Sequence, residues 1–498
     1  MFFQQMISLF NPLYMVVIFF CTILGIVFGA IPGLTGGMAV SLMLPLTFGM
    51  DTTLAFTMMI STWVGGISGG FIAATLVGIP GAPCSIATCF DAYPMSQRGE
   101  TVRALGIGIL ASFFGTFFSC VIATVLSPYL ADFAMKLGPW DYFSLCFCAI
   151  SLVAALSRGN IFKGMFAAFL GLFLSTVGVA PIDGAYRYTF GNVYLGGGID
   201  MVALMLGFYA VKEIDLNFAK GQQDMPPVNV GKISGFGVKI ADIIRNLGII
   251  IKSFLIGLWI GFLPGMGSGL SNMVAYAQAK AGSKHPETFG KGESGGIWAS
   301  ETSNNASIGG AMIPMVALGI PGDAVTALLL SGLMIHGLQP GPLLIQSNPQ
   351  LVYLMFAVII LSAIVVLVEQ FFGMRWFPLL LKISYHYLYS VILVLCLIGA
   401  FTSTNTLFNV LCVLVFAAMG IVMDMFDIPS SPLILAFILG HTVEEYFRKG
   451  VSYAKGDYSR FFTRPISLIF IIIAVICVFY PYVKSLIGKK GKKNVAAA

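Results

Sequence analysis

Charged residues are scarce in this sequence. Only 10% of its 498 residues are Asp, Glu, Lys or Arg, whereas 58% are hydrophobic. A soluble domain carries about 25% charged residues, so this chain has too few to cover a water-facing surface. The first basic residue is Arg98, and the others sit in short polar segments, as the charge bias of membrane loops predicts. The net charge of +6 is therefore no sign of a nucleic-acid partner.

Several chemical signatures are also missing. None of the nine cysteines forms a CxxC pair, and no Cys/His cluster has zinc spacing, so we expect buried free thiols and no metal beyond a possible Na⁺. The sequence has no P-loop, dinucleotide fingerprint or catalytic triad pattern. We therefore expect no enzyme, no ATP-driven pump and no cofactor apart from a coupling ion.

Long apolar runs are what the sequence has instead, for example at 15–31, 104–126, 351–368 and 466–480. About 20 apolar residues span a bilayer as a helix, and roughly ten to twelve such segments are present. Strands of a membrane barrel would alternate polar and apolar residues, and these runs do not. The sequence predicts an all-α polytopic membrane protein with the lipid bilayer as its surroundings.

Polar stretches divide the chain. We predict a first membrane half at 1–213, a polar connecting segment at 214–245 and a second membrane half at 246–443. Residues 444–498 hold a basic stretch, the last membrane span and a Lys-rich tail. If a single span separates the basic stretch from the Lys-rich tail, the two lie on opposite sides of the membrane. The rule that basic loops lie in the cytoplasm therefore gives this end of the chain no single orientation.

The two halves repeat each other. Gly25-Ile-Val-Phe-Gly-Ala-Ile-Pro-Gly-Leu-Thr-Gly-Gly37 aligns with Gly257-Leu-Trp-Ile-Gly-Phe-Leu-Pro-Gly-Met-Gly-Ser-Gly269 at an offset of 232 residues. Gly78-Ile-Pro-Gly81 recurs as Gly319-Ile-Pro-Gly322 at an offset of 241 residues. Duplicated halves with Gly/Pro interruptions at matching places are typical of secondary transporters. We therefore expect two structural repeats that face each other around one central cavity.

Each interruption predicts a broken helix or a re-entrant hairpin, because Pro lacks a donor and Gly favours non-helical backbone. A helix that restarts inside the membrane presents unpaired N–H groups and a partial positive charge, which bind an anion without Lys or Arg. For one break alone, the alternative is a proline kink with glycine-mediated packing. The predicted substrate-binding residues are Gly33, Leu34, Thr35, Gly36, Gly37, Pro80, Gly81, Ser85, Gly265, Gly267, Ser268, Gly269, Asn304, Asn305, Pro321, Gly322 and Thr326.

The densest polar stretch in an apolar setting is Ser300-Glu-Thr-Ser-Asn-Asn-Ala-Ser-Ile-Gly-Gly310. Glu301 is its one carboxylate, and it either takes a proton or a cation or caps the following helix, which is the preferred interpretation. Asp323 is equally a helix cap or a cation ligand. The candidates for binding Na⁺ or H⁺ are Ser303, Asn304, Asn305, Asp323 and Glu301.

Other ionisable residues have weaker patterns. Asp91, Arg98 and Arg375 fall near apparent helix ends, where long side chains reach towards water. His336 precedes a break, so it is either a helix-end residue or a proton relay. We expect none of these to hold the substrate.

Motifs from both halves carry a family resemblance. They are Pro32-Gly-Leu-Thr-Gly-Gly37, Leu44-Pro-Leu-Thr-Phe-Gly-Met-Asp51, Gly78-Ile-Pro-Gly-Ala-Pro83, Asp91-Ala-Tyr-Pro-Met95, Lys284-His-Pro-Glu-Thr-Phe-Gly-Lys-Gly292, Glu301-Thr-Ser-Asn-Asn305, Leu318-Gly-Ile-Pro-Gly322, Thr326-Ala-Leu-Leu-Leu330 and Met334-Ile-His-Gly-Leu-Gln-Pro-Gly-Pro-Leu343. In order and spacing they resemble the large membrane subunit of tripartite tricarboxylate transporters, across most of the chain.

The resemblance implies a multi-pass protein of the bacterial inner membrane that works with a small membrane subunit and a periplasmic substrate-binding protein. It implies secondary active transport by cation symport of citrate, another di- or tricarboxylate, or an aromatic acid. This sequence departs from the family at Asp323, where small residues are common, and at Thr302-Ser303, where alanines are frequent. A carboxylate-selective channel and an intramembrane enzyme are the alternatives.

Overall fold

The chain is almost entirely helical. The computed structural model describes residues 1–156, 161–220, 235–381 and 385–479. Within these ranges the strands are limited to one antiparallel pair, β1 (Gly178–Val179) and β2 (Tyr186–Arg187). The predicted all-α class is confirmed. Residues 221–234 of the predicted connecting segment and the Lys-rich tail lie outside the described residues.

Two compact units make up the chain, and neither is continuous in sequence. The first contains Met1–Met135 with Val202–Met419, and the second contains Lys136–Met201 with Gly420–Ala498. The predicted boundaries at 214–245 and at 444 follow the sequence repeats and polar stretches, and they stay a prediction.

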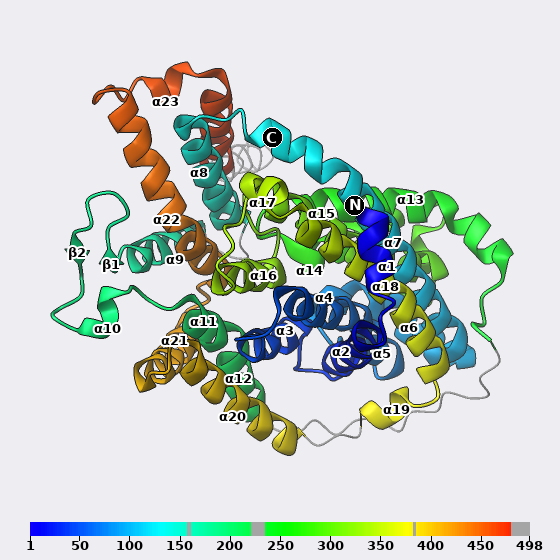
Figure 1. The fold of residues 1–498 in the computed structure, drawn as a ribbon. Coiled ribbons are helices and arrows are strands. Elements are labelled where there is room, and N and C mark those ends of the chain that lie inside the picture. The colour runs from blue at the N-terminus through cyan, green and yellow to red at the C-terminus, as the bar shows by residue number, and fades with distance from the viewer. Residues whose placement is uncertain (157–160, 221–234, 382–384, 480–498) are drawn as a thin grey trace, which may run out of the picture. The chain divides into compact units, whose positions relative to one another are not determined.

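The first unit holds both of the repeated motifs. Its elements in Figure 1 are α1 (Phe2–Ser8), α2 (Pro12–Ala30), α3 (Gly36–Leu46), α4 (Thr52–Gly69), α5 (Phe71–Leu76), η1 (Pro83–Ser85), α6 (Ile86–Met95), η2 (Ser96–Glu100), α7 (Thr101–Ala134), η3 (Leu206–Val211), α12 (Lys212–Lys220), α13 (Ile240–Phe262), α14 (Gly267–Ala281), η4 (Pro286–Thr288), α15 (Ser294–Leu318), α16 (Ala324–Ile335), α17 (Pro342–Ser347), α18 (Pro349–Gly373), α19 (Phe377–Leu380) and α20 (Tyr385–Thr404). Helices α11 (Met201–Met205) and α21 (Leu407–Met425) lie at chain positions where one unit ends and the other begins.

Six helices in the described residues are long and apolar enough to cross a membrane, and six shorter apolar helices accompany them. The long ones are Pro12–Ala30, Thr52–Leu76 (α4 and α5 together), Pro83–Ala134 (η1 to α7 together), Ile240–Phe262, Pro349–Gly373 and Leu407–Met425. A water-soluble protein would have polar faces on such helices. The helices therefore agree with the predicted polytopic membrane protein.

Helix α15 differs from these spans because it carries the polar stretch around Glu301. Every residue from Gly295 to Ala317 is buried, and the helix packs against α7, α13 and α14 (Figure 1). Polar side chains are tolerated at membrane depth where protein rather than lipid surrounds them. The polar stretch therefore lies inside the first unit.

The sequence repeat is a structural repeat, because equivalent glycines make equivalent contacts. Gly25 of α2 lies directly on the backbone carbonyl of Thr62 in α4, leaving no room for a side chain. Gly257 of α13 lies in the same way on the carbonyl of Ser303 in α15. These pairs are related by the same offsets of 232 and 241 residues that the motifs show. The pair α2–α4 thus packs like the pair α13–α15.

The second repeated motif gives the same result. Gly81 packs on the carbonyl of Gly29, and Gly322 packs on the carbonyl of Gly261. The offsets are again 241 and 232 residues. Such close backbone contacts require glycine at membrane helix crossings. The prediction of two structural repeats is confirmed by these matched contacts.

Both predicted interruptions break a helix. Helix α2 ends at Ala30 and α3 begins at Gly36, while α13 ends at Phe262 and α14 begins at Gly267. Gly33 and Gly265 have positive φ angles of 88° and 70°, which a side chain would strain. The breaks thus create helix N-termini part-way along each repeat, as expected.

The second unit is a separate helical body. Its elements are α8 (Pro139–Leu156), α9 (Ile161–Ser175), β1, β2, α10 (Val193–Gly196), α22 (Ser430–Tyr453), α23 (Arg460–Thr463) and the apolar helix Pro465–Phe479. Arg187 of the β hairpin forms a two-pronged ion pair with Glu444 of α22, with distances of 2.6 and 2.9 Å. Nearby, a hydrogen bond from Arg448 lowers the pKa of the exposed Asp183 carboxyl. These ion pairs fasten the hairpin to α22.

Candidate functional site

The starts of four helical segments come together in the first unit. They are the N-termini of α3, η1, α14 and α16, two from each repeat, and we call them the helix-start cluster. A methyl group at Gly37, in the first turn of α3, would lie 3.7 Å from Val325 in the first turn of α16. A methyl group at Gly269 of α14 would lie 3.5 Å from the carbonyl of Pro83 in η1. Each repeat therefore meets the other at its break.

These two contacts are reciprocal. Gly37 and Gly269 are equivalent by the offset of 232 residues, and Pro83 is equivalent to Ala324, the neighbour of Val325, by the offset of 241. The broken helix of the first repeat thus meets the second motif of the second repeat, and the reverse also holds. The repeats face each other, as predicted, with their breaks at the shared face.

The helix-start cluster is accessible from outside the protein. Thr35, Gly37 and the whole run from Leu263 to Gly269 are partly exposed, as is Asp323. The first N–H groups of a helix have no partner inside the helix. Of those in α3, the N–H of Met38 is donated to the Thr35 hydroxyl oxygen at 3.1 Å. The cluster therefore consists of partly exposed helix starts, whose dipoles favour negative charge.

No basic side chain belongs to the two broken segments. Neither 32–45 nor 264–272 contains Lys or Arg. An anion held here would meet backbone N–H groups and the hydroxyls of Thr35 and Ser268. The starts of α3 and α14 can thus attract negative charge without a fixed cationic partner, whereas the start of α16 is capped by the Asp323 carboxylate.

Not every predicted substrate residue faces this cluster. A methyl group at Gly36 would lie 2.9 Å from the Gly66 backbone of α4, so the absence of a side chain here serves packing. Gly81 and Gly322 have the same packing role, and Leu34 and Pro321 are buried. The carbonyl of Gly33 accepts a hydrogen bond of 2.6 Å from the Asn217 amide of α12.

Gly37, Gly267, Ser268 and Gly269 remain at the cluster itself, beside Thr35. Gly265 and Pro80 are partly exposed next to the breaks. Gly267 has a positive φ of 62°, whereas Gly37 and Gly269 have ordinary helical backbone. For Gly37 and Gly269, neither backbone conformation nor a close neighbour requires glycine.

Asp323 is the N-cap of α16. Its carboxylate accepts the N–H of Thr326 at 2.8 Å and the hydroxyl of the same residue at 2.7 Å. Thr326 is buried and satisfied by this capping box. The cap interpretation is therefore confirmed, and a cation role for Asp323 stays a prediction.

A second polar group lies deeper, around Glu301 of α15, and we call it the Glu301 cluster. The side chains of Glu301, Asn304 and Asn305 are completely buried. Glu301 accepts the hydroxyl of Thr88 from α6 and the amide groups of Asn304 and Asn305, at 3.3 and 3.4 Å. The hydroxyl of Ser85 is also near enough to stabilise the carboxylate. The predicted residues Ser85, Asn304, Asn305 and Glu301 are thus brought together.

Glu301 is no helix cap. Helix α15 begins at Ser294, and its N-cap is Glu293, two turns before Glu301. The preferred interpretation from sequence was wrong because the helix starts at Ser294, earlier than its polar residues suggest. Glu301 is instead an interior carboxylate with neutral neighbours, and such groups inside membrane proteins are commonly functional.

Two predicted cation ligands, Ser303 and Asn304, differ in whether their oxygen atoms already have partners. Ser303 donates its hydroxyl to the Ser271 carbonyl of α14 at 3.0 Å, which serves packing. The Oδ1 atom of Asn304 is buried and has no hydrogen-bond partner in the described part of the chain. A buried oxygen of this kind is costly unless something binds it. Asn304 is therefore the best-placed neutral oxygen for a cation next to Glu301.

Asp91 was also misread from sequence. It is fully buried rather than reaching towards water. Its Oδ1 accepts the backbone N–H groups of Gly290, Gly292 and Glu293, each at 2.8 Å, and its Oδ2 accepts the Tyr276 hydroxyl at 2.9 Å. These bonds fix the loop that leads into α15, and so they position the Glu301 cluster.

A protein-family model matches most of this sequence. It is the model of the tripartite tricarboxylate transporter TctA family, and it matches residues 15–435. The matched range includes the helix-start cluster, the Glu301 cluster and both repeats. The chain belongs to the tripartite tricarboxylate transporter TctA family.

Two relatives of this TctA-family chain come from Agrobacterium vitis. An uncharacterized 52.8 kDa protein of the TAR-I ttuC' 3' region is 30% identical over 482 residues, covering 97% of this chain and 96% of the relative. An uncharacterized protein of the TAR-II ttuC' 3' region is 30% identical over 234 residues, covering 47% of this chain and 97% of the relative. No solved structure matches the chain.

Reasoning from the sequence missed several polar partners in this TctA-family site. Asn272 of α14 accepts the N–H of Ala87 at 2.8 Å and donates to Thr88 at 3.3 Å. Asn305 accepts from Ser68 of α4 at 2.9 Å. Their common signal is a polar side chain in an apolar helix, which is weak because small hydroxyl residues also serve helix packing.

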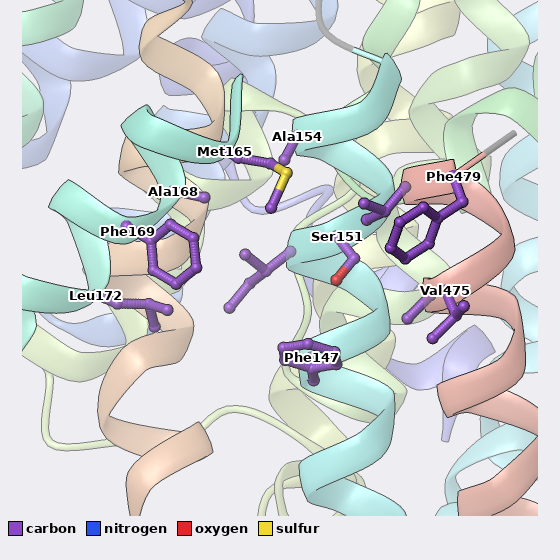
Figure 2. A pocket seen from close by; sticks show the side chains of 12 residues that line it. Phe147, Ser151, Ala154, Met165, Ala168, Phe169, Leu172, Val475 and Phe479 are labelled. Carbon is purple, nitrogen blue, oxygen red and sulfur yellow. The ribbon is translucent and has the colours of Figure 1, made fainter. Parts of the chain in front are cut away.

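The second unit holds a pocket of different character. Figure 2 shows it between α8, α9 and the helix Pro465–Phe479, with a volume of about 250 Å³. Phe147, Phe169 and Phe479 line it, and Ser151 supplies a hydroxyl. Because it has no charged or amide side chain, it lacks the means to hold a carboxylate.

Proposed function

We propose that this chain is the membrane-spanning carrier subunit that imports a small di- or tricarboxylate across the bacterial inner membrane. A periplasmic binding protein delivers the solute, a small membrane subunit is the stable partner, and Na⁺ or H⁺ entry drives uptake. The observation that carries the proposal is the reciprocal contact between the broken helix of each repeat and the second motif of the other, at partly exposed helix starts with no basic residue in either broken segment.

The helix-start cluster suits a carboxylate that must be released again. A hydrogen bond to a charged group contributes about 1.5–3 kcal/mol, so a few backbone donors give selective and reversible binding. Helix dipoles add to the attraction for an anion. Equivalent helix starts from the two repeats, gathered in one cluster, also match a solute with two or three carboxylate groups.

The Glu301 cluster is the proposed place of the coupling cation. It offers one carboxylate and the free Oδ1 of Asn304, both fully buried. A cation would neutralise the carboxylate in a site without Lys or Arg among its hydrogen-bond partners. Helix α15 also carries Ser303 and the adjoining Gly319 motif, so it connects the cluster to the helix starts.

The test is uptake into proteoliposomes that contain the purified chain with its small subunit. Radiolabelled citrate, other di- and tricarboxylates and an aromatic acid are offered with a purified binding protein, under a Na⁺ or a pH gradient. We expect saturable uptake that requires both the binding protein and one gradient. Non-saturating flux without the binding protein would indicate a channel, and chemical conversion of the solute would indicate an enzyme.

A further inference from the structure

Helix α18 contains a carboxylate that the proposed function does not use. Glu369 is the only Asp, Glu, Lys or Arg between Pro349 and Gly373, in one of the most apolar spans of the chain. An ionisable residue in such a span is costly and is commonly functional. Helix α18 runs from Pro349 to Gly373 with Asn348 as its N-cap, so Glu369 lies far from the helix start and is not a cap.

The carboxyl group of Glu369 points into the protein. Its Oε1 is 2.8 Å from the hydroxyl of Thr22 in α2. Its Oε2 is buried and has no hydrogen-bond partner among the described residues. No ion pair with Glu369 occurs in that part of the chain either. The side chain as a whole is partly exposed, but a negative charge on Oε2 would have neither water nor a cation beside it.

The elements packed against α18 supply no such cation. The helices that pack most extensively against α18 are α1, α2, α4, α7 and α17, and α1, α4 and α17 contain no Asp, Glu, Lys, Arg or His. The titratable side chains on the others are Tyr14 and Cys21 of α2, and Arg103, Cys120, Tyr129 and Asp132 of α7, with the amino terminus before α1. Arg103, the one cation of α7, pairs with Glu100 and Asp242. Phe236, in the segment before α13, also packs on Phe371 of α18, and Arg375, just after α18, lies over the ring of Trp376.

Thr22 can serve both protonation states of Glu369. Its hydroxyl has one hydrogen but lies near three acceptors: the carbonyl of Ile18 at 2.7 Å, the carbonyl of Phe19 at 2.9 Å, and Glu369. If the hydrogen goes to a carbonyl, as is usual for Thr in a helix, the Thr22 oxygen is free to accept from a protonated carboxyl. If Glu369 is ionised, the same hydrogen turns to its Oε1.

We propose that Glu369 is a proton-binding site of this transporter, with Thr22 as its switching partner. On binding, Oε1 forms an O–H bond and donates to the Thr22 oxygen, whose own hydrogen turns to the Ile18 carbonyl. On release, the proton leaves to water and the Thr22 hydrogen returns to the carboxylate. A rearrangement that admits water to Oε2 favours release. The inference rests on the proposed function for the solute that moves with the proton.

The site is connected to the Glu301 cluster through the next residue. The amide of Gln370 donates to the Ser68 carbonyl of α4 at 2.8 Å. The Ser68 hydroxyl donates to Asn305 at 2.9 Å, and the Asn305 amide donates to Glu301 at 3.4 Å. A movement of α18 on proton binding would thus reach α15 through a continuous set of hydrogen bonds.

The first test is infrared spectroscopy of the purified chain with its small subunit across a pH series. We expect a carbonyl stretch of a protonated carboxylic acid that fades as pH rises. Glu369→Gln should lose a component of this band that the matched control Glu301→Gln keeps, because Glu301 is itself a candidate for binding H⁺. An acid band of unchanged intensity in Glu369→Gln would overturn the site. This readout does not depend on transport.

The second test uses a pH-sensitive dye trapped inside proteoliposomes during solute uptake. Wild type should acidify the lumen together with uptake, Glu369→Asp should keep acidification, and Glu369→Gln should lose it while solute exchange continues. Wild-type uptake without acidification, or full acidification by Glu369→Gln, would refute a role in coupling. Absence of any uptake by wild type would instead refute the proposed function.

If Glu369→Gln does not fold, two variants of Thr22 test the proposal, one without the hydroxyl and one that keeps it. Thr22→Val removes the hydroxyl, so the acid band should move to higher frequency and the pH of half-maximal acidification should shift. Thr22→Ser keeps the hydroxyl and should resemble wild type. Identical bands in Thr22→Val and Thr22→Ser would also contradict the proposal.

Discussion

Gly37→Ala and Gly269→Ala should weaken substrate binding while leaving the protein at least as stable. Both positions have helical backbone, and the nearest atoms to an added methyl group are 3.6 Å and 3.5 Å away. Replacing Gly by Ala inside a helix normally stabilises it by about 0.5–1 kcal/mol. A fold that needed glycine here for packing would respond in the opposite direction.

The expected loss of binding free energy depends on how many backbone N–H groups the added methyl group keeps from the substrate. If it blocks one backbone N–H from a carboxylate, about 1.5–3 kcal/mol of binding is lost. At about 1.4 kcal/mol per tenfold change, the KM for uptake rises by roughly 10- to 150-fold. The maximal rate should change less, because no group of the Glu301 cluster is altered.

Gly248→Ala is the matched control. Gly248 is an exposed glycine of α13 with no atom within 4 Å of an added methyl group. It should gain the same helix stability without any change in KM. KM is measured by proteoliposome uptake and stability by thermal unfolding in detergent. Wild-type KM values for both Gly37→Ala and Gly269→Ala would refute the backbone site for the anion.

Three further changes test other parts of the structure. Gly257→Ala should destabilise the protein by about 1–3 kcal/mol, because its methyl group would overlap the Ser303 carbonyl; an unchanged unfolding temperature would contradict the repeat packing. Asp323→Ala should lose about 1 kcal/mol through its capping bonds; if uptake keeps its ion dependence, Asp323 is no cation ligand. Glu301→Gln should abolish gradient-driven uptake, and full gradient dependence in a folded variant would remove Glu301 from coupling.

The membrane class, the two repeats and the breaks were all predictable from sequence. Composition decides the surroundings of the chain, since so few charges exclude a water-facing surface. Glycine and proline spacing decides where helices stop, because backbone conformation at Gly33 and Gly265 is a local property. The equivalence of Gly25 and Gly257 was also visible in the sequence, because a helix contact that leaves no room for a side chain requires glycine in both repeats.

Tertiary structure alone decided what each polar or small residue touches. Gly36 and Gly37 are neighbours in the same motif, yet one packs on α4 and the other faces the helix starts. Asp91 had the pattern of a helix end but is buried under three backbone donors from a loop about 200 residues away in the chain. Such contacts join distant segments, so no local pattern encodes them.

The carboxylates give the same lesson. Glu301 was visible as a polar residue in an apolar stretch, but its burial by α6 and α7 follows from helix packing. The sequence analysis did not single out Glu369, and only its position against Thr22 of α2 distinguishes a proton site from a side chain that reaches water. Sequence thus determined which chemical groups lie in the membrane, and the packing of distant helices decided which of them are left without a partner.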